Sequence, residues 1–188
     1  LDSHYKFKIF TKHEVEPTFF KDVDLICVPG GVGDSDSFDI LLRSHAPAIR
    51  NFVASGGYYL GICMGAYWAD TDYLGLLNDI RVTQYIKHPS TCTRRPHAKA
   101  MDVIWQEDKL KMYFYDGATF EGNGPKETIA TYKTKLPMAI IQNNIGLIGC
   151  HPESEKWWYD AYTWMPRHWH NDTHGRYLLN FVNRLVND

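Results

Sequence analysis

The chain has 188 residues, of which 44% are hydrophobic and 22% are charged, and its formal net charge is −2. This length and balance are typical of one globular domain with a substantial core. The near-neutral charge gives no electrostatic basis for binding nucleic acid or an anionic membrane surface. No apolar run approaches the roughly 20 residues that a membrane-spanning helix requires.

The first half of the sequence alternates short apolar runs with amphipathic segments. Residues 4–11 and 23–31 are predicted strands, and the second run ends in Pro-Gly-Gly. Residues 37–57 have helical periodicity, and residues 58–63 predict another buried strand that leads into a helix starting at Met64. The predicted apolar stripe of the first helix comprises Ile40, Leu41, Ile49, Phe52 and Val53. This alternation favours a parallel α/β sheet with its functional site at the carboxyl ends of the strands.

The second half is richer in strand-like segments. Those before residue 135 span 81–89, 100–106, 109–120 and 127–133. Residues 137–153 contain two apolar runs around Asn143-Asn144, a pattern typical of a hairpin. Residues 173–188 predict an amphipathic helix, whose apolar stripe would comprise Leu178, Leu179, Val182, Leu185 and Val186.

Four cysteines occur in the chain, and none belongs to a CxxC pair. A chain of this length does not need disulfides, so we expect reduced thiols and a cytoplasmic location. Cys27 and Cys150 lie in apolar runs and are predicted to be buried small hydrophobic residues. Cys63 differs from them, because glycines stand two residues before and two residues after it.

The pentapeptide Gly61-Ile62-Cys63-Met64-Gly65 lies between a predicted strand and a predicted helix. This arrangement is typical of a nucleophile elbow, in which a strained turn points the nucleophile out of the sheet. The N-terminus of the following helix would place partial positive charge near the sulfur and favour the thiolate. A core cysteine in a glycine-rich turn is the alternative interpretation.

The tripeptide His151-Pro152-Glu153 follows a late apolar run. Alternate residues of an extended segment face the same side, and Pro152 keeps His151 extended. We therefore expect the imidazole and the carboxylate to leave the strand end together. Cys63 would then be a nucleophile, His151 its base and Glu153 the residue that orients the base. A surface turn is the alternative interpretation of the tripeptide.

The Pro29-Gly30-Gly31 turn also follows a predicted strand. Backbone N–H groups in such a loop can point at a developing oxyanion. The N–H groups of Gly30, Gly31 and Met64 are the predicted oxyanion hole. A plain turn that ends the strand is the alternative.

Along the chain, the order Pro-Gly-Gly, then Gly-Ile-Cys-Met-Gly, then His-Pro-Glu after a late strand resembles the class I glutamine amidotransferase superfamily. The wider sequence is similar to the N-terminal domain of biotin–protein ligases and its stand-alone relatives. The similarity lies in LICVPGG, FVASGGYYLGICMGAYWA, YFYDGATFEG, TIATYK, PMAIIQNNIGLIGCHPES and WWYD, which cover most of residues 23–160. The resemblance implies a flavodoxin-like three-layer α/β sandwich with a mainly parallel central sheet and a β-rich insertion. It also implies a triad of Cys63, His151 and Glu153, with no metal or organic cofactor.

The sequence departs from this family in several places. Tyr67 stands where glutaminases of the superfamily carry Gln, which argues against glutamine itself as the substrate and makes Tyr67 a substrate-pocket candidate. Met64 stands where peptidases of the same superfold carry histidine. No ligase catalytic domain is present. We expect residues 1–188 to form a single domain that lacks the strand and helix with which the family begins.

Asp34, Asp36 and Asp39 cluster beside the predicted oxyanion loop. The pattern favours a helix N-terminus capped by Ser35 or Ser37. Asp34 is nevertheless a second substrate-pocket candidate, because its carboxylate could bind a cationic group or a metal.

Histidines and aromatic residues crowd the segment after residue 156. His168, His170 and His174 are predicted to lie in a packed or hydrated loop, because nothing completes a convincing zinc site. The aromatic run over 157–169 would either wall the active-site cleft or cover the core, and we favour a core cover for most of it.

Two functions fit the motifs. The first is a cysteine-dependent amidase or amidotransferase-like hydrolase, which would act on a small-molecule amide or related C–N bond through a thioester. Since no synthetase domain is attached, an amidotransferase would need a separate synthetase or ligase chain. The second is a non-catalytic binding or regulatory module with a vestigial triad. The presence of nucleophile, base, orienting acid and oxyanion loop together favours the first.

Overall fold

The computed structural model describes residues 5–15, 17–31 and 35–187. Its centre is a seven-stranded sheet with the order β1-β2-β9-β8-β7-β4-β5. These strands are β1 (Leu25–Val28), β2 (Tyr58–Ile62), β4 (Lys99–Trp105), β5 (Asp108–Phe114), β7 (Glu127–Tyr132), β8 (Pro137–Gln142) and β9 (Ile145–Ile148). A small second sheet pairs β3 (Arg81–Gln84) with β6 (Ala118–Glu121).

Parallel and antiparallel pairing divide the large sheet into two parts. β1, β2 and β9 pair in parallel. The pairs from β9 through β8, β7 and β4 to β5 are antiparallel. Residues in β2 and β9 are almost all buried, as expected for parallel strands covered on both faces. The expected α/β fold with a β-rich insertion is therefore confirmed, and the insertion runs from β3 to β7.

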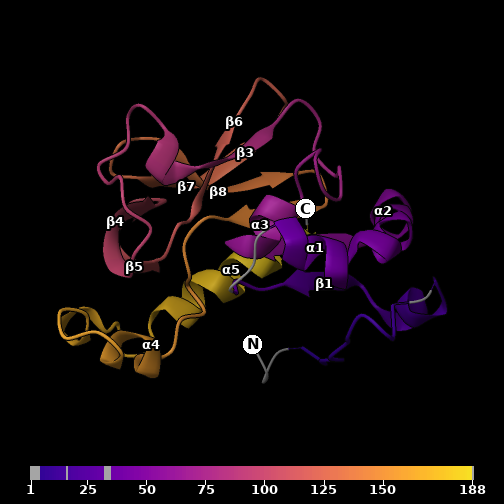
Figure 1. Ribbon diagram of the computed structural model, residues 1–188, viewed down its shortest axis with the longest axis horizontal. Coiled ribbons are helices and arrows are strands. Elements are labelled where there is room, and N and C mark those ends of the chain that lie inside the picture. The colour runs from indigo at the N-terminus through magenta and orange to yellow at the C-terminus, as the bar shows by residue number, and fades with distance from the viewer. Residues whose placement is uncertain (1–4, 16, 32–34, 188) are drawn as a thin grey trace.

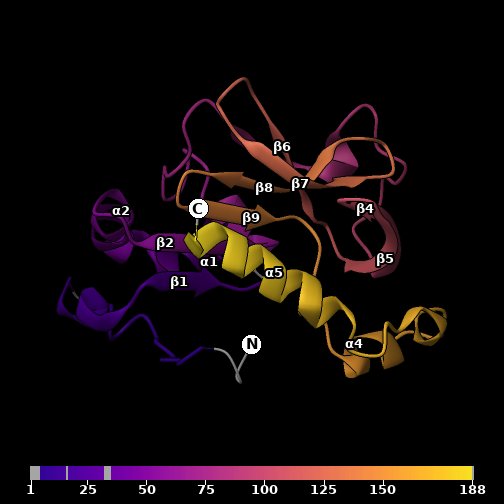
Figure 2. The same cartoon turned by 180° about the vertical axis from the view of Figure 1, so that it is seen from behind.

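Helices cover both faces of the sheet, as Figures 1 and 2 show. α1 (Ser35–Leu41), α2 (Ala46–Ala54) and α3 (Met64–Trp68) lie on one side, and α5 (His174–Asn187) crosses the other. α4 (Lys156–Asp160) lies beyond the end of the sheet. Short 3₁₀ helices span Pro17–Asp22, Arg43–His45, Tyr85–Lys87 and Pro166–His168. In the described part of the chain, no helix is both long enough and apolar enough to cross a bilayer.

Each face of the sheet has its own hydrophobic core. On the α5 side, Phe181 packs edge-on against Trp105, with ring centroids 6.1 Å apart. A Cβ atom at Gly146 would lie 2.6 Å from the Phe181 ring, so α5 approaches β9 where no side chain intervenes. On the opposite side, Phe38 of α1 packs edge-on against Trp68 of α3. The predicted C-terminal helix is confirmed, and its buried face also includes Tyr177 and Phe181.

Two predictions for the N-terminal half are wrong. Residues 5–11 form no strand, and residue 4 lies outside the described residues. Phe7 and Ile9 are exposed. The alternation of apolar and polar residues that predicted a strand therefore does not correspond to a buried face. The single helix predicted over 37–57 is instead two helices, α1 and α2. Pro47 lies in the first turn of α2, a position where proline favours the start of a helix.

The apolar stripe of that predicted helix changes as a result. Ile40 and Leu41 are exposed, whereas Phe38 and Leu42 are buried. Ile49 and Val53 are buried on α2, as predicted. The predicted stripe assumed one continuous helix through Pro47. Because α1 and α2 are separate helices, a single helical period does not describe which residues they bury.

Two of the predicted strands are shorter than expected. Residues 109–120 are divided by a turn at Tyr115–Gly117 into β5 and β6, which belong to different sheets. Asp116 has a φ of 55° there. The strand predicted over 81–89 ends at Gln84. The predicted hairpin is confirmed as β8 and β9, and Asn143 in its turn has a φ of 54°.

We expect acid to destabilise the fold through His174. Its ring stacks on His170 at 3.8 Å, and its Nδ1 atom is buried without a hydrogen-bond partner among the described residues. Burial lowers the pKa of His174 to about 3, with smaller contributions from His170 and Arg176. An unfolded histidine binds a proton below about pH 6.5, so the unfolded state takes up more protons and the free energy of unfolding falls as pH drops below that value.

Urea denaturation at several pH values between 7 and 4 measures this effect. His174→Phe keeps a stacking ring but cannot titrate, so its stability should fall less steeply with acid than that of the wild type. His97→Phe, at an exposed histidine, is the matched control and should leave the slope unchanged. Equal slopes for wild type and His174→Phe would refute the assignment.

Candidate active site

Cys63 occupies a sharp turn between β2 and α3. Its backbone has φ 48° and ψ −101°, a combination that side-chain-bearing residues rarely adopt. A Cβ atom at Gly65 would lie 1.9 Å from the carbonyl oxygen of Val28, and one at Gly61 would lie 2.4 Å from that of Gly65. Both positions therefore require glycine, and the predicted strand–turn–helix geometry is present.

The Cys63 side chain is enclosed by three neighbouring segments and is 6% exposed. Its N–H donates to the carbonyl of Ile148 at the end of β9 (2.8 Å), and its sulfur lies 3.7 Å from the carbonyl oxygen of Tyr115. α3 has only five residues, so its dipole is small. Activation of Cys63 by the helix N-terminus therefore stays a prediction.

His151 and Glu153 form a hydrogen-bonded pair beside this turn. The distance from His151 Nδ1 to Glu153 Oε1 is 2.8 Å. Since an ionised carboxylate only accepts, Nδ1 carries a proton and donates it, which leaves Nε2 for Cys63. The His151 N–H also donates to the carbonyl of Tyr113 (2.9 Å). Pro152 and Glu153 lie in a turn rather than in the extended segment that the sequence predicted, so the turn brings the carboxylate back to the ring.

The surroundings of His151 favour its charged form. Burial lowers its pKa, but the charge of Glu153 and then the charge and hydrogen bond of Cys63 act more strongly in the opposite direction. The resulting pKa lies well above the ordinary value for histidine. The second carboxylate oxygen of Glu153 is buried and has no hydrogen-bond partner among the described residues.

Gly30 and Gly31 lie where the oxyanion loop was predicted, at the end of β1. A Cβ atom at Gly30 would lie 2.3 Å from His151 Cε1 and 3.4 Å from the Cys63 Cβ. A Cβ atom at Gly31 would lie 3.3 Å from the terminal methyl of Met64. Gly30 therefore lies against both Cys63 and His151, and Gly31 lies beside Met64, the residue after Cys63. The role of these three residues as an oxyanion hole stays a prediction.

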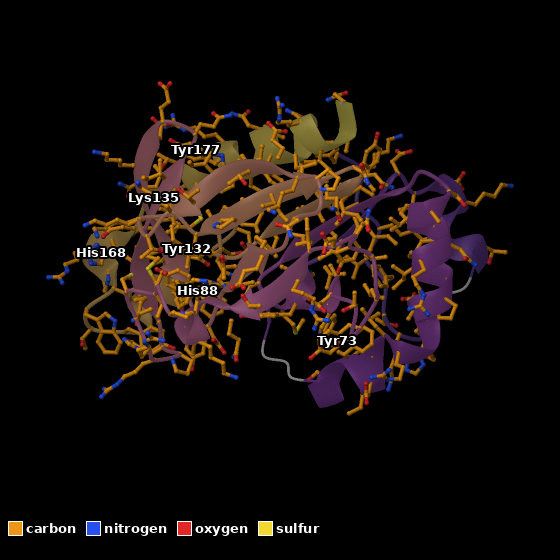
Figure 3. The ribbon with its side chains drawn as sticks, turned by 90° about the horizontal axis from the view of Figure 1, so that it is seen from above. Tyr73, His88, Tyr132, Lys135, His168 and Tyr177 are labelled. Atoms are coloured by element: carbon orange, nitrogen blue, oxygen red, sulfur yellow. The ribbon has the colours of Figure 1, made fainter. Side chains whose placement is uncertain are left out.

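A cleft of about 1020 Å³ begins beside the turn, and Tyr67 of α3 lies in its wall. The Tyr67 hydroxyl donates to the backbone carbonyl of Asp116 (3.0 Å). In Figure 3, Tyr73 and His88, which also line the cleft, lie on the side of the sheet away from Tyr177 of α5. Tyr67 is thus placed as a pocket residue, whereas Asp34 lies outside the described residues.

Aromatic residues after the triad contribute to both the site and the core. The Trp158 ring lies 5.2 Å from that of His151 in an edge-to-face arrangement, and Tyr113 lies 5.8 Å from it. Tyr159 is fully buried behind them. Trp158 therefore shields His151 from water, while Tyr159 packs in the core.

Sequence reasoning did not identify Gln84 and Asp116 in the cleft wall. The Gln84 side-chain amide donates to the Asp116 carboxylate (2.8 Å). The Asp-Gly pair at residues 116–117 was the available signal, because such pairs mark tight turns at strand ends.

No group of three or more His, Cys, Asp or Glu side chains among the described residues is arranged to hold a metal ion. His170 and His174 stack on each other instead, and His170 Nε2 lies 3.2 Å from the carbonyl oxygen of Ser154. His170 lies in a packed loop as predicted, whereas His174 is the first residue of α5 and His168 is the last residue of a 3₁₀ helix.

Comparisons with known proteins bear on this arrangement. The model of the family described as "Biotin-protein ligase, N terminal" matches residues 1–73. No curated protein matches the chain significantly. The solved structure of a glutamine amidotransferase is 20% identical, with 89% of this chain and 84% of that chain covered and a TM-score of 0.62.

Two further solved structures are similar. A glutamine amidotransferase from Thermotoga maritima is 15% identical over 88% of this chain and 79% of that chain, with a TM-score of 0.57. A putative GMP synthase subunit from Thermoplasma acidophilum is 14% identical over 92% of this chain and 78% of that chain, with a TM-score of 0.58. The chain therefore shares its fold with solved glutamine amidotransferases, and its first 73 residues match the family model described as the N-terminal part of biotin–protein ligase.

Proposed function

We propose that the protein is a cysteine-dependent amidase or amidotransferase-like hydrolase that acts through a thioester. The observation that carries this proposal is the convergence at one turn of Cys63, in a strained conformation, with a buried His151 that Glu153 orients. Backbone strain of this kind persists where the surrounding structure enforces it, and such sites are often catalytic.

In the proposed first step, the Cys63 sulfur attacks the carbonyl carbon of an amide and forms a C–S bond. The negative charge moves to the carbonyl oxygen, near the N–H groups of Gly30, Gly31 and Met64. His151 holds the proton taken from the thiol and returns it to the nitrogen, so that the C–N bond breaks and an amine or ammonia leaves.

In the second step, water attacks the thioester carbon. His151 accepts a proton from this water, the C–S bond breaks and a carboxylic acid leaves. Glu153 keeps the imidazole oriented throughout and stabilises its charged form. Trp158 and Tyr113 limit the access of bulk water to the ring, which strengthens the interaction between His151 and Glu153.

The substrate is proposed to be a small-molecule amide that enters through the cleft beside Tyr67. Because one similar structure is described as part of a synthase, we also propose that a separate synthetase chain uses any ammonia released. A cytoplasmic location remains our expectation from the unpaired cysteines.

A non-catalytic binding or regulatory module is the second candidate. Two observations favour it: the match of residues 1–73 to a ligase-associated region, and the 6% exposure of Cys63. The two candidates differ in the chemical reactivity of the Cys63 sulfur, which can be measured without knowing the substrate.

If the triad is functional, iodoacetamide should alkylate Cys63 near neutral pH faster than it alkylates Cys92, even though Cys92 is exposed. His151→Ala should remove that advantage, because the neighbouring imidazolium favours the thiolate. Peptide mass spectrometry against reagent time gives both rates from one digest. Equal rates at the two cysteines, unchanged by His151→Ala, would favour the binding module.

The raised pKa of His151 has a consequence for an anionic reagent. Iodoacetate should react rapidly with Cys63 while His151 is protonated, and its rate should fall as pH rises through the raised His151 pKa. Glu153→Gln removes the charge that most raises this pKa, so the fall should move to lower pH. Glu155→Gln, at the next acidic residue along the chain, should leave the profile unchanged. A profile that is the same in Glu153→Gln and wild type would contradict the assigned role of Glu153.

Adjacent glycines allow a test of the packing around the triad. Gly30→Ala places a methyl group against the His151 ring and should reduce Cys63 alkylation at least tenfold, about 1.4 kcal/mol in the activation barrier. Gly31→Ala meets only the flexible end of Met64 and should retain the rate within about threefold, since one methyl group can be accommodated there. Thermal denaturation of both variants controls for loss of fold. Equal rates in the two variants would show that Gly30 does not position His151.

A further inference from the structure

We propose that Asp116 forms a subsite for a positively charged nitrogen, in the cleft beside Cys63. This inference rests on the proposed function and narrows its substrate class to amides that also carry an ammonium or guanidinium group. Asp116 would then determine specificity by contacting the substrate at a distance from the bond that breaks.

The position of Asp116 connects it to both the nucleophile and the cleft. The carbonyl of Tyr115, the preceding residue, lies 3.7 Å from the Cys63 sulfur. The carbonyl of Asp116 itself accepts a hydrogen bond from Tyr67, which stands four residues after the nucleophile. The same turn that contacts the sulfur therefore holds the carboxylate in the cleft wall.

Only one of the two oxygens of the Asp116 carboxylate has a hydrogen-bond partner among the described residues. Its Oδ2 atom accepts a hydrogen bond from the Gln84 amide (2.8 Å). Its Oδ1 atom is buried and has no hydrogen-bond partner among the described residues. A carboxylate oxygen without a donor is unfavourable, and Oδ1 has almost no exposed surface. A ligand with a charged N–H group would therefore gain free energy there once the Asp116 side chain turns toward the cleft.

The other acidic side chains of the cleft already have partners. Asp70 and Asp72 both lie within ion-pair distance of Arg81. Glu121 accepts a hydrogen bond from Thr83 and lies 3.4 Å from His88 Nε2. Asp116 differs from them, because no cation in the described part of the chain lies within 4 Å of its carboxylate.

The electrostatics of Asp116 agree with this assignment. Burial raises its pKa, while the Gln84 hydrogen bond and the charge of Lys87 oppose the increase. Lys87 lines the same cleft and partly offsets the negative charge. A bound cation would favour the ionised carboxylate, so ligand binding and ionisation of Asp116 would support each other.

Charged thiol reagents test the subsite without a known substrate. Three methanethiosulfonates would be used: the 2-aminoethyl form carries an ammonium group, the 2-sulfonatoethyl form an anion and the methyl form no charge. Peptide mass spectrometry gives the rate of Cys63 modification for each, and the ratio of the cationic to the anionic rate measures charge preference. The rate at which each reagent modifies the exposed Cys92 in the same samples controls for differences in intrinsic reactivity between the reagents.

We expect Asp116→Asn to lower the rate ratio at Cys63 roughly tenfold, because it removes a charge-assisted hydrogen bond. Asparagine tolerates positive φ, so the backbone at 55° should be retained. Asp72→Asn is the matched control, since it removes one negative charge from the same cleft but one that is already paired with Arg81. It should change the ratio less than twofold if the effect is local. Gln84→Met, which removes the amide that orients the carboxylate, should lower the ratio in the same direction.

An unchanged ratio in Asp116→Asn, or equal changes in Asp116→Asn and Asp72→Asn, would overturn the subsite. The neutral reagent separates this result from failure of the proposed function. A slow neutral rate at Cys63 that His151→Ala does not alter would refute the triad, while the charge ratio would still report on Asp116.

Discussion

The turn at Cys63 depends on a contact between backbones that leaves no room for side chains. Gly65 lies against the carbonyl of Val28 in β1, and Gly61 lies against the carbonyl of Gly65. Because β1 and α3 approach so closely, Cys63 is held in a conformation that it would not otherwise adopt. The hydrogen bond from its N–H to Ile148 then joins the turn to β9, whose end leads directly to His151. Replacing either glycine with a larger residue would push these segments apart and separate the residues of the site.

Burial and charge act in opposition at the base. An isolated histidine in this position would be neutral, since desolvation disfavours the imidazolium. Glu153 reverses that outcome because its carboxylate is bonded to Nδ1 and its second oxygen is buried. The aromatic ring of Trp158 contributes to the screening, so the hydrophobic cover strengthens the electrostatic interaction. The arrangement suits a group that must hold a proton beside a sulfur and release it to a leaving nitrogen.

Local sequence patterns predicted the parts of the site that lie within single turns. The glycines around Cys63 and the hairpin at Asn143 depend on backbone preferences of a few residues. His151-Pro152-Glu153 forms a turn rather than the extended segment that such preferences predicted. Tertiary packing decided the rest. The alternation over 4–11 predicted a strand, but Phe7 and Ile9 meet no partner surface. The apolar periodicity of the sequence continues past Pro47, but the helix does not, because α2 begins as a new helix there. Asp116 was not identified because Gln84, its hydrogen-bond donor, is 32 residues away and nothing local connects them.

The parallel pairing of β2 with β9 has an evolutionary consequence. Ile62 and Ile148 are partners in the register, so Cys63 and His151, the proposed nucleophile and base, follow adjacent strands that are separated by about 4.8 Å. Hydrogen bonds within the sheet thus set the spacing of the reactive groups, whereas Gln84 and Asp116 belong to the insertion between β3 and β7. Mutations at Gln84 and Asp116 can alter which molecules are accepted, whereas Tyr113 and Tyr115 of the same segment contact His151 and the Cys63 sulfur and are constrained by the proposed chemistry. Under the proposed function, chemistry and selectivity therefore depend on different residues, and new specificities can arise by divergence of the cleft wall while the residues around the sulfur are held constant.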